Sequence, residues 1–376
     1  MKKGISILII TLLFMVSMNT VMASDDTLDI EKVAIHAIKN SQAVQSMDRQ
    51  VTQAQKDYAD MQAMANQLRG ILPYQNSYQI VKTIVLRPLE LENMLTQVTN
   101  GQFVVTNAVR LSAYKAYIDL LKANYNSNIQ QGLMNSFDAD YKKAQLQQKL
   151  GTISQSQLRL REIAYLKAQY SYDSAQKAYN SASMSVNHMM GEDLVKRYST
   201  LQDYNITPAA QIKPLNDYIT MALANRADII NAQNTLDIKK KQYEYGKAEV
   251  PTDFEFYIQK QEYAIESAQN DLELAKISVQ QDITDLYKNL ASAMKNMKAM
   301  KDLKEQAAQE YQAAETQYKN SQISLLELND ATVAKAQADV NYKNAELDVW
   351  LIQTAMDLSC NIGCQPLNIS SISDPF

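Results

Sequence analysis

The shortage of glycine and proline constrains the fold of this chain more than any other feature of its sequence. Only 8 of its 376 residues are Gly and 7 are Pro, roughly a third of the combined share that is usual in proteins. Tight turns depend on these two residue types. The composition therefore disfavours β-sandwiches, barrels and dinucleotide-binding domains, and it predicts an all-α chain of long helices joined by few corners.

The proline-free stretches indicate where the longest helices lie. No proline occurs between Pro88 and Pro208, or between Pro251 and Pro366. Within the second stretch, apolar residues recur at steps of three and four, which is the spacing of a coiled-coil seam. We predict one helix from Asp253 to Asn320, and at about 1.5 Å per residue it would be roughly 100 Å long. A helix of this length implies a rod, a hairpin or the wall of a tube.

The sequence contains an internal repeat in two sets of matches. Residues 37–40 match residues 222–225 at an offset of 185, which also pairs Tyr58 with Tyr243. Residues 153–154 match residues 323–324 at an offset of 170, which also pairs Leu158 with Leu328. The order is the same in both halves, and the first half carries 15 extra residues between its anchors. A duplicated helical hairpin explains this pattern, although two Ala-rich helical stretches can also match by chance.

Each half then predicts an outward helix, a long returning helix and a final helix. The predicted helices span residues 28–69, 105–150 and 154–190 in the first half, and 215–246, 253–320 and 324–361 in the second. The predicted organisation is a signal peptide (1–23), a first helical repeat (24–191), a linker (192–213), a second helical repeat (214–363) and a C-terminal tail (364–376). The predicted fold class is thus all-α, with long antiparallel helical hairpins in two tandem structural repeats.

The N-terminus has the pattern of a secretory signal peptide. Lys2 and Lys3 precede an apolar run from Ile5 to Val16, and small residues follow at Ala23. An uncleaved anchor is the alternative, although the run is short for a membrane span. Removing residues 1–23 takes away two lysines and no acidic residue, so the formal net charge falls from −4 to −6. A negative chain disfavours nucleic acid as a partner.

Few residues have the chemistry of a catalytic or metal site. His36 and His188 fall in separate predicted helices, and no nucleophile, phosphate-loop or zinc-protease motif is present. Cys360 and Cys364 can form a disulfide after export, or they can remain free thiols at a helix end; their spacing makes a poor zinc site. We therefore expect no enzyme activity, no cofactor and no metal.

The two predicted hairpin tips have similar sequences. The first contains Gly151, Ile153 and Ser154, and the second contains Ser321, Ile323 and Ser324. In each tip a small residue ends one helix, and a serine can cap the next helix. An isoleucine exposed at both tips would suggest a docking surface, whereas an isoleucine that packs back on its hairpin would not. The residues alone leave both interpretations open.

At this point the chain resembles the TolC family of outer-membrane efflux proteins. The resemblance covers nearly all of the mature chain and rests on the signal peptide, the two halves, the Ala-x-x-Asn opening of each half, and the tips followed by Leu158 and Leu328. It implies a homo-trimer whose long helices form a hollow cylinder. It also implies that the tips meet an adaptor (membrane fusion) protein, which is joined to a transporter in the inner or cytoplasmic membrane.

The resemblance also implies roles for particular residues. The docking tips carry over to the six tip residues named above. Acidic residues that ring the pore entrance in the family correspond here to Glu327 and Asp330. Their three-residue spacing puts them on one helix face, and copies around an axis would form a constriction that attracts cations. The alternative is a solvated face, with charges that are favourable near a helix N-terminus.

This sequence departs from the family where the family has membrane strands. The second half offers only residues 246–253, which fit a turn. The first half offers one strand-like stretch, residues 78–86, and Pro88 then looks like the start of another helix. A membrane strand needs about 9–11 alternating residues, so we expect the β-barrel to be absent or vestigial. The expected location is the cell envelope, at the outer membrane by resemblance, or at the cell surface or wall if the source has no outer membrane.

Three classes of function remain on sequence grounds. The leading hypothesis is an exported helical conduit component of an efflux or secretion system. The alternative is a structural or adhesive helical rod at the cell surface that transports nothing. A third is the adaptor class, which usually adds β-rich modules for which this chain lacks the Gly-rich segments.

Overall fold

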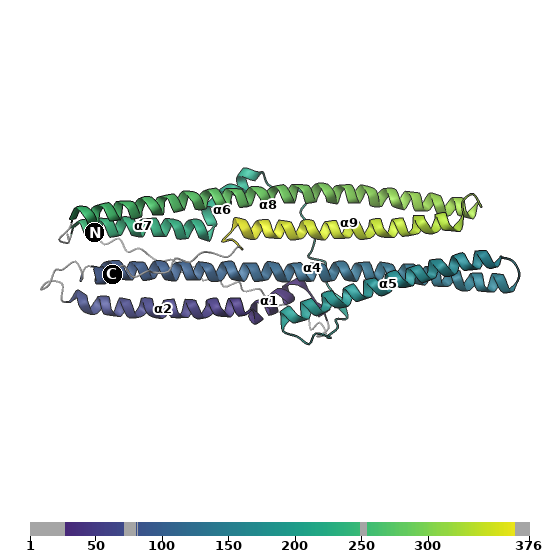
Figure 1. Cartoon of the computed structure of the whole chain (residues 1–376), viewed down its shortest axis with the longest axis horizontal. Coiled ribbons are helices and arrows are strands. Elements are labelled where there is room, and N and C mark those ends of the chain that lie inside the picture. The colour runs from purple at the N-terminus through teal and green to yellow at the C-terminus, as the bar shows by residue number, and fades with distance from the viewer. Residues whose placement is uncertain (1–26, 71–79, 81, 249–253, 365–376) are drawn as a thin grey trace.

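The protein is an elongated bundle of long helices that run along one axis (Figure 1). The computed structural model describes residues 27–70, 80, 82–248 and 254–364. The first half contains α1 (Ile30–Asn40), α2 (Gln42–Arg69), the π-helix η1 (Lys82–Leu86), α4 (Arg87–Lys149) and α5 (Gln155–Met190). The second half contains α6 (Leu215–Asn225), α7 (Ala227–Ala248), α8 (Phe254–Lys319) and α9 (Leu325–Cys360). The predicted all-α class is confirmed.

Local signals in the sequence explain where these helices begin and end. The Asp29 carboxylate accepts a hydrogen bond of 2.8 Å from the backbone N–H of Lys32 and so caps α1. Pro88 occupies the first turn of α4, where its missing N–H costs no hydrogen bond. Gly191 ends α5 in the left-handed conformation, with φ at 69°. The helix predicted at Pro88 is therefore present, and it forms the start of α4.

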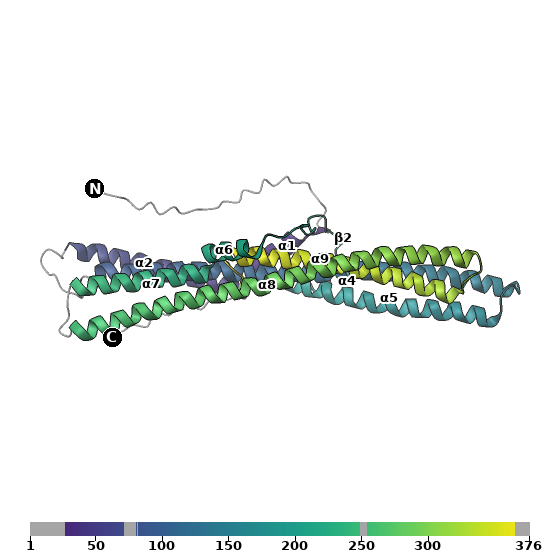
Figure 2. The ribbon, with the colours of Figure 1, turned by 90° about the horizontal axis from the view of Figure 1, so that it is seen from above.

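Two long helices organise the whole molecule. α4 is lined along its length by α2 and α5, and α8 is lined in the same way by α7 and α9. α4 also contacts α7 and α9 of the other half, which joins the halves. Away from the tips the helices lie in rows, in the order α8, then α7 with α9, then α4, then α2 with α5, and toward the tips α5 crosses α4 (Figure 1). Seen from above, they cross at small angles along the whole length (Figure 2). Both hairpin tips lie at the same end of the molecule.

A small sheet in the middle of the molecule is an element that the sequence reasoning missed. β1 (Thr27–Leu28) pairs in parallel with β2 (Thr200–Leu201), which lies in the predicted linker. The buried Tyr117 hydroxyl lies 2.7 Å from the carbonyl oxygen of Leu28 and 2.9 Å from that of Gln202. Leu28 and Tyr117 belong to one apolar core with α1 and the end of α5. The linker is therefore fixed on α4.

Equivalent contacts in the two halves support the repeat. The Asn40 side-chain amide donates to the carbonyl oxygen of Met190, and the Asn225 amide donates to that of Cys360 at 3.5 Å. Asn40 and Asn225 are 185 residues apart, and Met190 and Cys360 are 170 apart. The two offsets found in the sequence therefore relate real contacts, each of which ties the end of a hairpin to the helix break beside it.

Several predicted boundaries were wrong. The predicted helix 28–69 is broken at Ser41 and the predicted helix 215–246 at Arg226, while the returning helix starts at Arg87 rather than at residue 105. Each break residue has extended backbone. In the strand-like stretch 78–86, residues 82–86 form the helix η1, and residues 78, 79 and 81 lie outside the described residues.

Other predictions concern segments outside the described residues. The predicted signal peptide, residues 249–253 of the second turn, and residues 365–376 of the tail are among them. Gly246, where that turn was expected to start, lies within α7. In the part of the chain that the structure describes, no helix combines the length and the apolar character needed to cross a bilayer.

Candidate functional site

The two hairpin tips have the same backbone turn. Gly151 adopts a φ of 74°, and Ser321 adopts a φ of 60°. The backbone N–H of the next residue in each turn donates to a carbonyl oxygen five residues earlier, from Thr152 to Gln147 at 2.9 Å and from Gln322 to Gln317 at 2.8 Å. This is the pattern by which helices end in a left-handed residue. The tip residues that the sequence paired are therefore structurally equivalent.

A capping box starts the final helix at each tip. The Ser154 backbone N–H donates to Gln157 Oε1 at 2.8 Å, and Gln157 returns a backbone N–H to Ser154 Oγ at 3.2 Å. At the second tip, Glu327 Oε2 accepts from both the backbone N–H and the hydroxyl of Ser324, at 2.7 Å each. Those two hydrogen bonds lower the pKa of Glu327 below its ordinary value.

Ile153 and Ile323, the residues between the turn and the cap, are half-buried. Each therefore leaves part of its side chain in solvent. Docking through these two residues remains a prediction. A half-exposed isoleucine at the end of a rod is still an apolar contact that a partner could cover.

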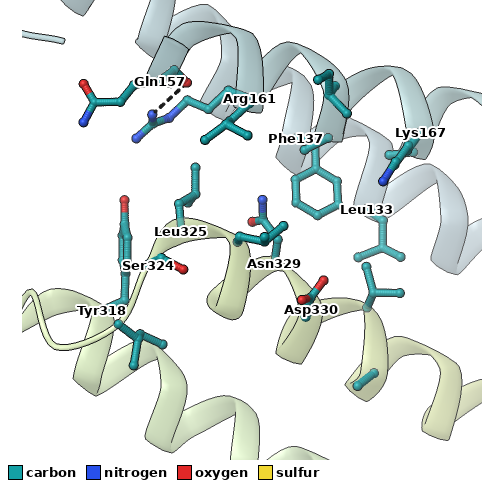
Figure 3. A pocket seen from close by; sticks show the side chains of 18 of the residues that line it. Leu133, Phe137, Gln157, Arg161, Lys167, Tyr318, Ser324, Leu325, Asn329 and Asp330 are labelled. Atoms are coloured by element: carbon teal, nitrogen blue, oxygen red, sulfur yellow. Dashed lines mark hydrogen bonds between the residues drawn. The ribbon is translucent and has the colours of Figure 1, made fainter. Parts of the chain in front are cut away.

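A groove separates the two hairpins near their tips (Figure 3). Its volume is about 1190 Å³, with α4 and α5 on one side and α9 with the end of α8 on the other. Apolar side chains such as Leu133, Phe137 and Leu325 line it. The groove is thus an elongated apolar space that is open at the same end as the tips.

Charged side chains of opposite sign lie on opposite walls of this groove. Arg161 and Lys167 project from α5, and Asp330 projects from α9 (Figure 3). The Arg161 guanidinium is mostly buried and pairs with Asp140 at 3.1 Å. The α5 wall therefore presents the exposed ammonium of Lys167, and the α9 wall presents the carboxylate of Asp330.

The structure separates the predicted site residues into two groups. Ser321, Ile323, Ser324 and Asp330 line the groove, whereas the first-tip residues Gly151, Ile153 and Ser154 lie beyond its lining. Glu327 is also absent from the lining, because its carboxylate turns back to Ser324. The geometry thus favours a capping role for Glu327, while a pore-entrance role remains a prediction for both acidic residues.

The sequence reasoning missed the α5 wall of the groove. Its members recur every three or four residues, which was a readable helical face in the sequence. That face could have been found by applying the seam rule to residues 154–190 as well as to the second half. The α5 residues concerned are Gln157, Leu160, Arg161, Ile163, Ala164, Lys167, Ala168 and Ser171.

The two cysteines are free thiols in the structure. Cys360 is buried beside Met356, with 3.8 Å between the sulfur atoms, and Cys364 Sγ lies 3.5 Å from Ser359 Oγ. Burial raises the pKa of the Cys360 thiol to about 11, which disfavours the thiolate that disulfide formation requires. Oxidation of this pair remains a prediction. Among the described residues, no group of His, Cys, Asp and Glu side chains could hold a metal ion.

These features define an elongated protein of two repeated helical hairpins, with paired tips and an open groove at one end. No protein-family model and no curated protein sequence matches the chain. Solved structures do match its fold. VceC, an outer membrane protein of Vibrio cholerae, superposes with a TM-score of 0.61 at 10% identity, over 89% of this chain and 97% of that one.

Two further structures give the same result. CusC matches with a TM-score of 0.63 at 11% identity, over 89% of this chain and 92% of that chain. The outer-membrane channel OprN matches with a TM-score of 0.62 at 12% identity, over 90% and 91%. At such low identity the likeness establishes the fold alone, which this chain shares with these outer-membrane proteins.

Proposed function

We propose that this chain is an exported, TolC-like conduit component of an efflux or secretion system. Several copies, three by the family resemblance, would stand side by side with their long helices parallel and enclose a pore. The proposal is supported by the likeness to outer-membrane channel structures over about nine-tenths of the chain. It places the protein in the cell envelope, at the outer membrane, or at the surface or wall of a cell without one.

The observation that carries this proposal is the pair of equivalent tips at one end of the rod, with an open groove between them. A purely structural rod has no need of two matched tips beside an apolar groove. In our proposal the half-exposed Ile153 and Ile323 bind an adaptor (membrane fusion) protein, which connects the conduit to a transporter in the inner or cytoplasmic membrane. Helical hairpins of a partner fit an apolar groove of this kind.

A pore-entrance role is proposed for Asp330 before Glu327. Asp330 is exposed on the groove wall, with Lys167 on the opposite wall. Glu327 is exposed as well, but its carboxylate is held by Ser324. Copies of Asp330 around an axis would attract cations to the entrance.

The test is complementation in source cells that lack the gene. Accumulation of fluorescent amphiphiles such as ethidium and Nile red should rise in the deletion strain and return to normal with the wild-type gene. The double variant Ile153→Asp with Ile323→Asp should fail to restore export, because a charge at each tip prevents apolar contact. The variant's helicity, measured by circular dichroism, should be unchanged, since both side chains lie outside the core.

A matched control is Ile35→Asp on α1, where the wild-type isoleucine is 62% exposed and far from the tips. It should restore export fully. Normal export by the double tip variant would overturn docking through the tips. Unchanged accumulation in the deletion strain for every dye tested would favour the rod at the cell surface instead.

A further inference from the structure

Each half has a site beside the break between its first two helices. In the second half, side chains fill this site. Arg226 lies at the break between α6 and α7, and its side chain is only 5% exposed. Its guanidinium pairs with Asp228 at 2.7 Å and with Asp282 at 3.4 Å. The turn after α9 covers it, since a Cβ added at Gly363 would lie 3.4 Å from Arg226 Nε. Three charged side chains and a turn therefore fill this site.

The equivalent site in the first half is open. The offsets of 185 and 170 replace the three charged residues with Ser41, Ala43 and Ser112. A pocket of about 490 Å³ lies at this place, and its other walls are mostly apolar and small: Ala37, Asn40, Val105, Ala108, Val109, His188 and Met189. The pocket is thus the vacant counterpart of the Arg226 site.

α4 packs beside the filled site, and its equivalent in the second half is α8, which is exposed at the corresponding positions. Asn107 of α4 donates a hydrogen bond of 2.9 Å to the carbonyl oxygen of Gly363, beside Arg226. Its equivalent, 170 residues later, is Ile277 on α8, where the side chain is 59% exposed. Leu274, one turn earlier, is 63% exposed. Leu274 and Ile277 are therefore an exposed apolar pair on α8, the helix that the repeat relates to α4.

We propose that Leu274 and Ile277 of one copy insert into the pocket beside Ser41 of a second copy. α8 then packs on the neighbour's α2 and α5 as α4 packs on α7 and α9 within the chain. The contact joins unlike surfaces, so repeating it closes a ring if the rotation allows. This inference rests on the proposed conduit, which needs several copies around a pore.

A pair of charges independently identifies a second copy as the occupant. Within the chain, the Gln242 side chain of α7 donates to Glu90 of α4 at 2.6 Å. The equivalents of these two residues are Asp57 on α2, which is half-buried, and Lys260 on α8, which is exposed. The same packing between copies therefore brings opposite charges together.

A second polar pair follows the same rule. Asn100 of α4 donates to Asn231 of α7 at 2.7 Å. Their equivalents are Asn270 on α8 and Ser46 on α2, which can also form a hydrogen bond. Polar residues thus face polar residues, and the apolar pair faces the apolar pocket, along the same length of helix.

The first test uses sedimentation velocity of the full chain over a range of concentrations. Leu274→Asp with Ile277→Asp should weaken self-association by at least about tenfold, because burying even one such side chain contributes that much to binding. The control is Val195→Asp, at an apolar side chain elsewhere that is 69% exposed, and it should associate like the wild type. Circular dichroism checks that each variant is folded.

The second test exchanges the charges and does not touch the core. Lys260→Glu and Asp57→Lys should each weaken association, and the double variant should restore it. Lys301→Glu, on the same helix, is the control, since the residue equivalent to Lys301 is the exposed Gln131. Association that is unchanged by the Leu274 and Ile277 substitutions, or not restored by the double exchange, overturns this packing and leaves the conduit proposal intact. A wild-type chain that stays monomeric throughout overturns both.

Discussion

At the scale of single residues, the second tip differs from the first in one ionisable group. Gln157 closes the first capping box, and Glu327 closes the second. Both side chains satisfy the backbone N–H of the capping serine. Only the carboxylate can be protonated, which removes its charge and leaves a weaker acceptor. The two tips are therefore alike near neutral pH and should differ in acid.

We expect the second tip to loosen in acid while the first stays closed. The pKa of Glu327 is lowered in the folded state, so its contribution is fully present above the pKa of an unfolded glutamate. That contribution is lost as the pH falls through the lower, folded value. Amide hydrogen exchange at Ser324 and Glu327, corrected for intrinsic rates, should then rise relative to Ser154 and Gln157. Glu327→Gln should abolish the difference, and equal protection in acid without that substitution would contradict the assignment.

Single residues also show where sequence reasoning reached its limit at the tips. The pairing of Gly151 with Ser321 was read from the sequence, and both adopt a positive φ. Serine pays a steric cost in this region that glycine does not, so no propensity rule would have predicted that conformation at Ser321 alone. The partner of Arg161 is Asp140 on α4, so this pair depends on how α4 packs on α5, which no local signal encodes.

At the scale of elements, the long helices could be predicted and their interruptions could not. Proline-free stretches and the seam spacing located α4, α5, α8 and α9. The breaks at Ser41 and Arg226 contain neither Gly nor Pro, so the usual stop signals were absent. Each break is held by tertiary contacts, such as the one from Asn40 to Met190. Tertiary structure therefore overrides helix propensity at these two points.

The break at Arg226 provides a prediction about stability. Arg226→Ser, which introduces the residue found at the equivalent Ser41, removes both ion pairs and leaves space under the covering turn. Asp228 and Asp282 are partly exposed and can be hydrated, so we expect a loss of about 2 kcal/mol rather than the larger cost of a fully buried charge. Urea unfolding followed by circular dichroism measures it.

The reverse substitution is the control for this break. Ser41→Arg places a guanidinium in the open pocket, where the equivalent positions Ala43 and Ser112 supply no carboxylate. It should gain no stability, because no partner there can pair with the charge. Surface substitutions usually change the free energy of unfolding by less than about 0.5 kcal/mol. If Arg226→Ser lowers it by no more than that, the cluster contributes little to stability.

At the scale of the whole molecule, all the long helices share one axis and both tips share one end. α8 alone has 66 residues, so at about 1.5 Å per residue it extends roughly 100 Å. The row order places α8 at one edge and α2 with α5 at the other, with α4 contacting both halves. The sequence predicted the hairpins but not this order, which depends on contacts such as that between Gln97 and Thr235.

Side-by-side packing of copies predicts how the dimensions of an assembly change with its mass. Lateral packing of α8 on a neighbour's α2 and α5 keeps the copies parallel, so the length is set by a single copy. We expect small-angle X-ray scattering to show a maximum dimension that increases little from monomer to oligomer, while the cross-section grows with each copy added. End-to-end association through the tips would instead nearly double the maximum dimension. Leu274→Asp with Ile277→Asp separates the two modes, because it should return the cross-section to the monomer value only if the copies associate side by side.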